Sequence, residues 1–312
     1  MPRTSTSCGS SGYSPLLALT DIKIAHTVFA LPFALLAAVL ALPTGTQSPV
    51  PSPQTLFPLI LACMFFARTW AMLVNRLADR EFDRDNPRTA ARVFASGRLT
   101  PRQGWAVAGA SALAFVGCCA LFWVLLDNPW PLILCGPVLG WIALYSYTKR
   151  FTWSCHLFLG GALAASPIAA LIAVNPDLLW SWAPAARAVA LLAGFVLLWV
   201  AGFDIAYALQ DFDFDRRLGL HSIPAAMGPR GALGVARGLH AGAFVCLWAS
   251  RMVEPRLGAV FAAACVLVGA ILIVEHWVLA RRGVAGLPLA FFTLNGVVSI
   301  VLGAAGIADV VW

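Results

Sequence analysis

Charged residues are scarce in this chain of 312 residues. Only 11% of the residues are Asp, Glu, Lys or Arg, whereas 60% are hydrophobic. A water-soluble domain carries charge on about a quarter of its residues, so this composition excludes an ordinary soluble globular domain. The apolar residues gather in runs of about 20, which is the length that a helix needs to cross a bilayer.

We identify nine such runs, each long enough for a membrane-spanning helix of about 20 residues. They lie at roughly 24–43, 56–75, 103–126, 130–148, 155–174, 186–206, 231–250, 257–280 and 286–308. The predicted fold class is all-α: a polytopic membrane bundle of nine transmembrane helices, with residues 21–312 forming a single domain.

The sequence also lacks the usual cysteine and histidine motifs. None of its eight cysteines belongs to a CxxC or CxxxH pair, so neither a disulfide framework nor a zinc site is supported. Histidine boxes are missing as well, which argues against a di-iron desaturase. The first 20 residues have no long apolar core, so they do not resemble a cleaved signal peptide. We expect them to form a disordered tail.

Basic residues are sparse in every second connection between consecutive apolar runs. Residues 44–55 and 127–129 contain no Lys or Arg, whereas the segments 76–102, 149–150, 216–230 and 281–282 hold most of them. Positively charged loops stay in the cytoplasm, which predicts a cytoplasmic N-terminus and a C-terminus on the other side. The net charge of +7 thus reflects membrane topology and gives no support for a nucleic-acid partner.

Acidic residues are concentrated in two short stretches. Of fourteen acids, four lie within 79–85 and four within 204–215. Each stretch begins where an apolar run is expected to leave the bilayer on the cytoplasmic side. Helical spacing of four residues places Asn75, Asp79 and Asp83 on one face, and it does the same for Asp211 and Asp215.

Three further polar residues share these two helical faces. Arg68 precedes Asn75 by seven positions, Asp204 precedes Asp211 by seven, and Tyr207 lies between the last two at helical spacing. Ionisable residues within apolar helices are costly and usually face a cavity in the bundle. We therefore expect both faces to line such a cavity.

Two interpretations of the acidic stretches remain open at this point. In the first, arginines that alternate with the acids form a solvated, salt-bridged loop. In the second, the carboxylates bind Mg²⁺, which takes one or two protein carboxylates and completes its shell with substrate phosphates. Two facing motifs would hold a diphosphate, and a dry apolar cavity would suit an allylic diphosphate that ionises to a carbocation.

The two stretches resemble motifs of a known family. NRLADREFDRDNPRTAAR, from Asn75, and DIAYALQDFDFDRRLGLHSIPAAMG, from Asp204, are similar to the two aspartate motifs of the UbiA-type intramembrane aromatic prenyltransferases. YSYTKRFT at 145–152 is similar to the basic segment of that family. The resemblance runs from about residue 20 to the C-terminus, and the branch it resembles most is that of the 4-hydroxybenzoate polyprenyltransferases, some members of which are thought to serve menaquinone synthesis by the futalosine route.

The resemblance implies a fold and a reaction. It implies a nine-helix bundle with a central cavity, in the plasma (inner) membrane of a prokaryote, with the active site facing the cytoplasm. It also implies Mg²⁺-dependent transfer of a polyprenyl group from polyprenyl diphosphate to an aromatic acid, either 4-hydroxybenzoate or a dihydroxynaphthoate. Diphosphate would be released, and the product would enter ubiquinone or menaquinone biosynthesis.

The resemblance also implies roles for residues that match the motifs. The first metal site would comprise Asn75, Asp79 and Asp83, and the second Asp211 and Asp215.

Substrate-binding and catalytic roles follow in the same way. Lys149 would neutralise diphosphate oxygens together with Arg88, while Asp204 and Tyr207 would line the cavity and orient the acceptor or a metal-bound water.

Arg68 and Lys23 are candidates to bind the carboxylate of the acceptor, since both are basic residues within or beside apolar runs. Arg68 alternatively pairs with a buried acid, and Lys23 alternatively extends to the membrane interface.

The segments at about 76–102 and 209–230 would form cytoplasmic cap loops over the cavity. Two other functions remain as alternatives: a CDP-alcohol-type phosphotransferase, which also uses membrane aspartates and a divalent metal, and a cation transporter.

Overall fold

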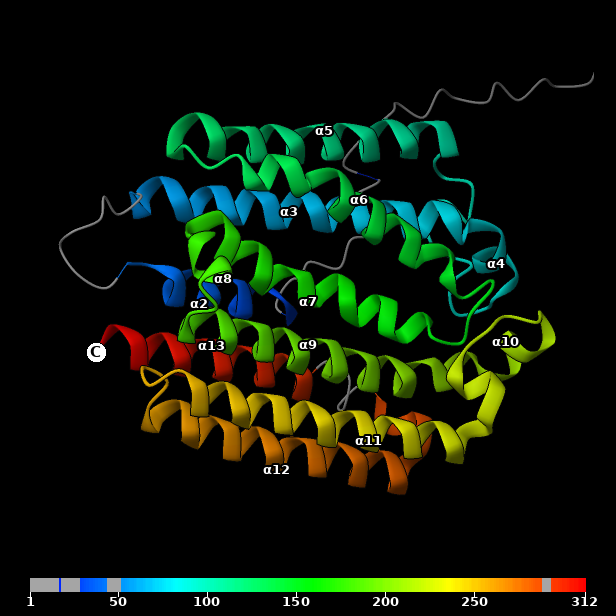
Figure 1. Cartoon of the computed structure of the whole chain (residues 1–312). Coiled ribbons are helices and arrows are strands. Elements are labelled where there is room, and N and C mark those ends of the chain that lie inside the picture. The colour runs from blue at the N-terminus through cyan, green and yellow to red at the C-terminus, as the bar shows by residue number, and fades with distance from the viewer. Residues whose placement is uncertain (1–16, 18–28, 44–51, 288–292) are drawn as a thin grey trace, which may run out of the picture.

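Long helices lie side by side along one direction in the computed structural model of the protein (Figure 1). The structure describes residues 17, 29–43, 52–287 and 293–312, and these residues form helices and no strands. In chain order the elements are α2 (Leu31–Ala41), α3 (Pro53–Ala78), α4 (Arg80–Asp85), α5 (Pro101–Leu126), α6 (Trp130–Thr148), α7 (Cys155–Val174), α8 (Asp177–Trp180), α9 (Pro184–Ala208), η2 (Leu209–Asp211), α10 (Phe212–Arg217), α11 (Ile223–Val253), α12 (Ala259–Arg282), η3 (Gly283–Gly286) and α13 (Asn295–Val311).

The all-helical membrane fold is confirmed, whereas the count of nine spans stays a prediction. Seven helices are long and apolar enough to cross a bilayer within the described parts of the chain. The first and last predicted spans correspond to the shorter helices α2 and α13, of 11 and 17 residues. Residues 18–28, which hold Lys23, and residues 288–292 lie outside the described residues.

Helix starts follow local signals in the sequence. Proline, which lacks a backbone N–H and is tolerated in the first turn, stands at the start of α3, α5 and α9. Before α5, Thr100 and Gln103 form a reciprocal capping box. Before α11, the side chain of Ser222 accepts a hydrogen bond from the backbone N–H of Ala225.

The second predicted cap loop is largely helical rather than irregular. Residues 209–217 form η2 and α10, and α11 already begins at Ile223. The boundary between loop and span lies instead inside α11, at Gly228, whose φ of 72° interrupts the helical backbone before Pro229. The Ser222 cap explains the early start of this helix.

The core is centred on α9, which packs most extensively against α7 and α11. Trp199 of α9 is fully buried and stacks on Phe195 with 5.5 Å between ring centroids. Small residues bring the helices close: a Cβ atom on Gly160 of α7 would collide with the backbone oxygen of Leu197, and one on Gly303 of α13 would collide with Pro32. The tight contact between α7 and α9 positions part of the site described below.

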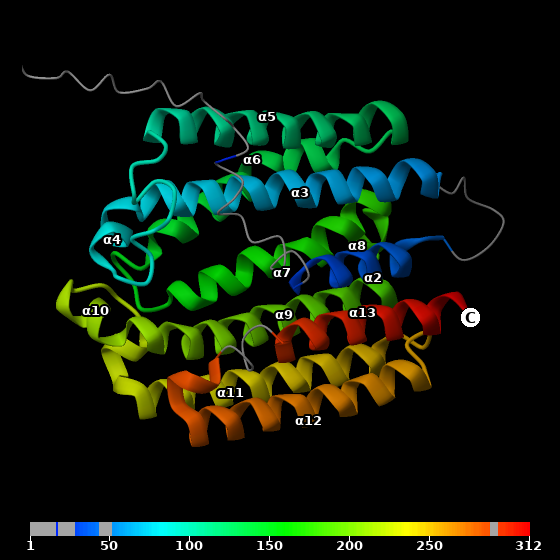
Figure 2. The ribbon, with the colours of Figure 1, turned by 180° about the vertical axis from the view of Figure 1, so that it is seen from behind.

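Both acidic stretches lie at the same end of the bundle. The short helices α4 and α10 are neighbours at the end opposite the C-terminus, as the front and back views both show (Figures 1 and 2). Residues 79–85 and 204–215 are distant in sequence but lie at the same end of the fold, because α3 and α9 both end there.

Candidate active site

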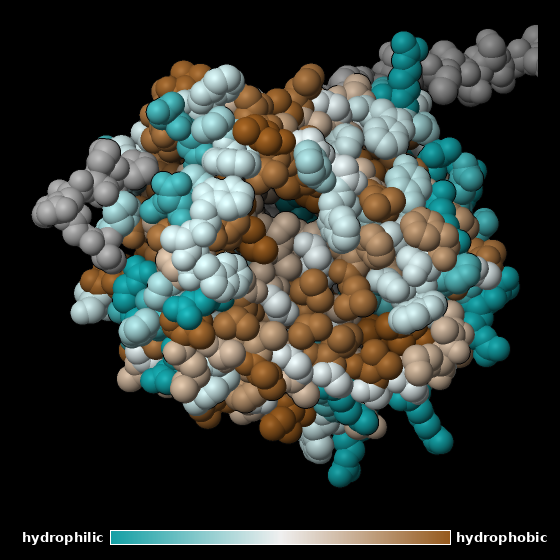
Figure 3. Space-filling model, in the orientation of Figure 1, coloured by the Kyte–Doolittle hydropathy of each residue, from teal (hydrophilic) through white to brown (hydrophobic). Residues whose placement is uncertain are grey.

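A cavity of about 690 Å³ reaches from the acidic end into the middle of the bundle. It lies between α3, α5, α6, α7 and α9. Its acidic end is lined by polar side chains, and its far end by apolar ones that include Ile60, Phe122 and Leu134. A hollow among brown and pale residues is visible on one face of the molecule (Figure 3). The shape suits a ligand with a charged head and an apolar tail.

The first acidic stretch places three oxygen-bearing side chains on the cavity wall. Helix α3 ends at Ala78, yet the backbone N–H groups of Asp79 and Asp83 still donate to the carbonyls four residues earlier. Asn75, Asp79 and Asp83 therefore stay stacked along the cavity, as the spacing predicts. Asn75 Nδ2 donates to Asp79 Oδ2 at 3.1 Å, and Arg150 lies 3.8 Å from the other Asp79 oxygen.

Asp83 is buried and paired with an arginine from the same segment. Arg92 Nη1 donates to both Asp83 oxygens, at 2.7 and 2.8 Å. This contact ties Asp83 to the segment that follows α4. Asp85, which falls off the predicted face, is exposed.

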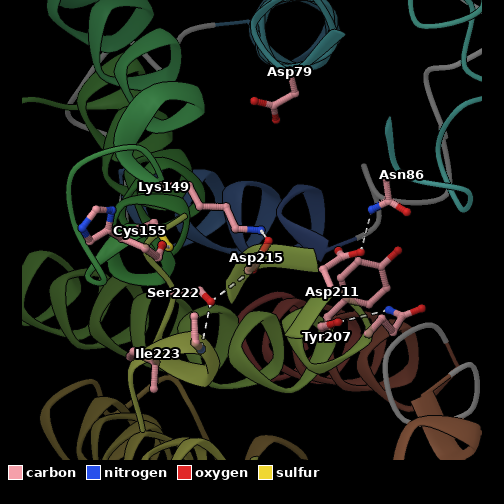
Figure 4. Close-up of polar contacts among 12 residues, drawn as sticks. Asp79, Asn86, Lys149, Cys155, Tyr207, Asp211, Asp215, Ser222 and Ile223 are labelled. Carbon is pink, nitrogen blue, oxygen red and sulfur yellow. Dashed lines mark hydrogen bonds and ion pairs between the residues drawn. The ribbon is translucent and has the colours of Figure 1, made fainter. Parts of the chain in front are cut away.

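Two residues that directly follow the first acidic stretch bind the second one. Arg88 donates from Nη2 to Asp211 Oδ2 at 2.6 Å and from Nε to Oδ1 at 3.2 Å, and Asn86 Nδ2 donates to Oδ1 at 3.0 Å. The guanidinium of Arg88 also lies over Tyr207, 5.7 Å from the ring centroid. Figure 4 shows the side chain of Asn86 pointing toward Asp211.

Asp215 is nearly inaccessible and has two partners. The Lys149 ammonium lies 2.7 Å from Asp215 Oδ1, and Ser222 Oγ donates to Oδ2 at 3.1 Å (Figure 4). Lys149 immediately follows α6, and its backbone oxygen accepts from the N–H of His221, which ties the two segments together. Lys149 and Asp215 thus meet from two different elements, and Asp79 lines the same cavity.

Burial and neighbouring charges shift the ionisation of these groups. Desolvation, reinforced by Asp83, raises the pKa of Asp79 to about 6. Burial by itself would lower the pKa values of Arg88 and Lys149, but the carboxylates of Asp211 and Asp215 outweigh it and raise both. The basic side chains therefore stay charged, and Asp79, with Arg150 at 3.8 Å, is less closely paired than Asp83, Asp211 or Asp215.

Deeper in the cavity lie Arg68, Asp204 and Tyr207. Arg68 forms no ion pair with any carboxylate in the described part of the chain, and its Nε atom is buried without a hydrogen-bond partner. The alternative that Arg68 pairs with a buried acid thus finds no support there. Asp204 accepts a hydrogen bond from His156 Nδ1 at 2.7 Å.

Comparison with known proteins places this arrangement in a family. Residues 30–307 match the UbiA prenyltransferase family. The chain belongs to this family. It also resembles the apo structure of a UbiA homolog from Aeropyrum pernix K1, with a TM-score of 0.77 and 32% identity over 92% of this chain and 99% of that one.

Further UbiA relatives are more distant or matched over shorter regions. The 4-hydroxybenzoate octaprenyltransferases of Hydrogenovibrio crunogenus and Alcanivorax borkumensis are 32% and 34% identical over 57% and 54% of this chain. These matches span 58% and 54% of the relatives, so little more than half of their length is covered. A UbiA homolog from Archaeoglobus fulgidus bound to GPP and Mg²⁺ shares the fold, with a TM-score of 0.68 and 18% identity over 95% and 100% of the two chains.

The oxygen donors of this UbiA protein fit a hard divalent cation by their chemistry. The four carboxylates and one amide predicted to bind metal all line a single cavity, and Mg²⁺ prefers such ligands. In this structure each carboxylate contacts a basic side chain instead, and the described residues contain no group of three or more His, Cys, Asp or Glu side chains close enough to hold an ion. Metal binding therefore requires these pairs to separate.

Several residues at the UbiA site were not singled out from the sequence. They are Asn86, Arg92, Ser222 and His156, all in contact with a predicted site residue. The NPRT segment after Asp85 contained a signal for Asn86, because it is part of the motif on which the resemblance depends. Ser222 lies within the second motif in the same way. His156 carried no signal, since its partner Asp204 is 48 residues away on another element.

Proposed function

We propose that this protein transfers a polyprenyl group from polyprenyl diphosphate to an aromatic acid inside the membrane, with Mg²⁺ as the cofactor and release of diphosphate. The observation that carries the proposal is the meeting of both acidic stretches and four basic side chains at the polar end of a long apolar cavity. The names of the curated relatives and the GPP and Mg²⁺ bound by the Archaeoglobus fulgidus homolog agree with it.

The head of the prenyl substrate would bind at the acidic end. Asn75, Asp79 and Asp83 would hold one Mg²⁺, and Asp211 and Asp215 another. Bound Mg²⁺ supplies charge neutralisation for the leaving diphosphate.

Lys149 and Arg88, once released from their carboxylates, would donate to diphosphate oxygens. In the structure the carboxylates of Asp211 and Asp215 raise both pKa values, and the anionic diphosphate would take over that role. They are therefore available throughout the neutral pH range.

The tail of the substrate would fill the apolar part of the cavity. The C1–O bond of the allylic diphosphate breaks, and its electron pair leaves with the diphosphate oxygen. The apolar lining keeps water from the resulting cation, which water would otherwise quench. A ring carbon of the acceptor then forms the new C–C bond, and the displaced ring proton leaves to a base.

The acceptor would bind between Arg68 and Asp204. Arg68 presents a guanidinium without an acidic partner in the described chain, which suits the carboxylate of 4-hydroxybenzoate or a dihydroxynaphthoate. Asp204 would accept from the hydroxyl group and take the ring proton, with Tyr207 beside it. We place the cavity mouth on the cytoplasmic side, as the distribution of basic loops predicts.

The test is a prenylation assay in membranes that contain the protein. Radiolabelled prenyl diphosphate is incubated with 4-hydroxybenzoate or 1,4-dihydroxy-2-naphthoate, with Mg²⁺ or with EDTA, and organic-soluble product is identified by mass spectrometry. We expect a prenylated acid only with Mg²⁺. Absence of product with every acceptor, together with metal flux in proteoliposomes, would instead favour the transporter.

A further inference from the structure

His156 contacts Asp204, a cavity carboxylate that has no Lys or Arg partner in the part of the chain that the structure describes. It is the second residue of α7, only 2% exposed, and its Nδ1 atom lies 2.7 Å from Asp204 Oδ2. Asp204 belongs to α9 and lines the cavity. The contact therefore joins the two helices whose close approach is allowed by Gly160, one turn further along α7.

The other ring nitrogen of His156 fixes its tautomer. The backbone N–H of Ile223 donates to His156 Nε2 at 3.3 Å. A backbone N–H can only donate, so Nε2 must accept and the ring hydrogen must be on Nδ1. The imidazole of His156 is thus neutral and donates its Nδ1–H to Asp204.

The Ile223 N–H belongs to the first turn of α11, where backbone N–H groups have no partner within the helix. The neighbouring Ser222 binds Asp215 and also caps this turn. His156 therefore holds three helices in register: α7 by its backbone, α9 through Asp204, and α11 through Ile223. Figure 4 shows Ser222 and Ile223 beside Asp215 at this junction.

We propose that His156 is a positioning residue for Asp204. By donating to Oδ2 it fixes the orientation of the carboxylate, and it leaves Oδ1, which has no hydrogen-bond partner within the described chain, to accept from the phenolic hydroxyl of the acceptor. This inference rests on the proposed function. It assigns recognition of the hydroxyl group to Asp204 together with His156, and recognition of the acid group to Arg68.

Two substitutions by amide residues test the two hydrogen bonds of the His156 ring one at a time. In H156N the amide nitrogen can replace Nδ1 and still donate to Asp204, whereas the contact with Ile223 is lost. In H156Q the amide oxygen can reach the position of Nε2 and accept from Ile223, whereas the donor to Asp204 is lost. We expect H156Q to lower kcat/KM for the acceptor about tenfold or more, as is typical for loss of a hydrogen bond to a charged group, and H156N to lower it only about threefold.

The kinetic parameters distinguish positioning from a structural role. In both variants, KM for prenyl diphosphate should stay within about twofold of the wild-type value, because only the acceptor contacts are changed. His221→Asn, at an exposed residue outside the cavity, serves as the control and should retain wild-type kinetics. Equal losses in H156N and H156Q, or a greater loss in H156N, would overturn the proposal.

A spectroscopic measurement does not depend on activity. In protein labelled with ¹⁵N-histidine, the ring signal that disappears in H156N should show a protonated Nδ1 and an unprotonated Nε2 at neutral pH. The opposite tautomer, or a doubly protonated ring, would overturn the inference. If wild-type protein makes no prenylated product while the tautomer is as expected, the proposed function fails and the local geometry stands.

Discussion

At the scale of single residues, a basic side chain contacts each of the four predicted metal-binding carboxylates, which are Asp79, Asp83, Asp211 and Asp215. Asp211 is the most extensively bound of them, because Arg88 and Asn86 contact it from a segment more than a hundred positions earlier. Asp213, two residues further on, is exposed and does not line the cavity. This difference provides a matched pair of substitutions within one short segment.

We expect Asp211→Asn to abolish most activity. The substitution removes a charge needed to hold the metal at the diphosphate, and loss of such transition-state stabilisation costs about 3 kcal/mol or more, which is about 100-fold in rate. The measurement is prenyl transfer in membranes normalised to the amount of folded protein. Asp213→Asn should keep wild-type activity, and similar losses in the two variants would contradict a special role for Asp211.

Arg68→Gln should affect acceptors according to their acid group. Because Arg68 has no acidic partner in the described chain, its removal leaves no orphaned carboxylate there, and the loss should concern the substrate alone. With 4-hydroxybenzoate, kcat/KM should fall about tenfold to 100-fold, whereas with an unsubstituted phenol it should change little. Equal losses with both acceptors would show that Arg68 does not bind the acid group.

At the scale of helices, spacing predicts which residues share a face, but not which elements meet. The intervals of four between Asn75, Asp79 and Asp83 place them together even though α3 ends at Ala78, because the backbone hydrogen bonds continue through the break. The pairing of Arg88 with Asp211 spans 123 positions, and no local pattern encodes it. Composition and periodicity thus predict the helices. They also predict which face of α3 and which face of α9 line the cavity, whereas the contacts across the cavity depend on tertiary packing.

The contact between α7 and α9 offers a test at this scale. Gly160→Ala should destabilise the protein by about 1–3 kcal/mol, since the added methyl group meets the backbone oxygen of Leu197 and not a side chain that can move away. Thermal unfolding in detergent measures this effect. Gly140→Ala in α6 is the control, because nothing lies within 4 Å of its Cβ position. Comparable unfolding temperatures for the two variants would contradict tight packing at Gly160.

At the scale of the whole molecule, the polar end of the cavity is a balanced set of charges. Four carboxylates face four basic side chains, with Asp83, Asp211 and Asp215 each within 2.7 Å of a cation. A metal ion added alone would displace these Lys and Arg side chains from their carboxylates and leave them without an anionic partner. A diphosphate added alone would meet cations already occupied by carboxylates. The balance favours a coupled exchange, in which the acids move to the metals and the freed cations to the diphosphate.

This coupling predicts cooperative binding of Mg²⁺ and a diphosphate. The ligand is a prenyl thiodiphosphate, whose carbon–sulfur bond resists cleavage. Isothermal titration calorimetry should give an affinity of the protein for it at least about tenfold higher with Mg²⁺ than with EDTA, which corresponds to a coupling free energy of about 1.4 kcal/mol. Reciprocity requires that the analogue raise the affinity for Mg²⁺ by the same factor. The association of Mg²⁺ with the analogue in free solution is measured separately and subtracted.

Asp85→Asn, at an exposed acid outside the cavity, should keep the full coupling, whereas Asp83→Asn should reduce it. Tight binding of Mg²⁺ alone, unchanged by the analogue, would mean that the ion pairs of this structure do not have to separate before the metal binds.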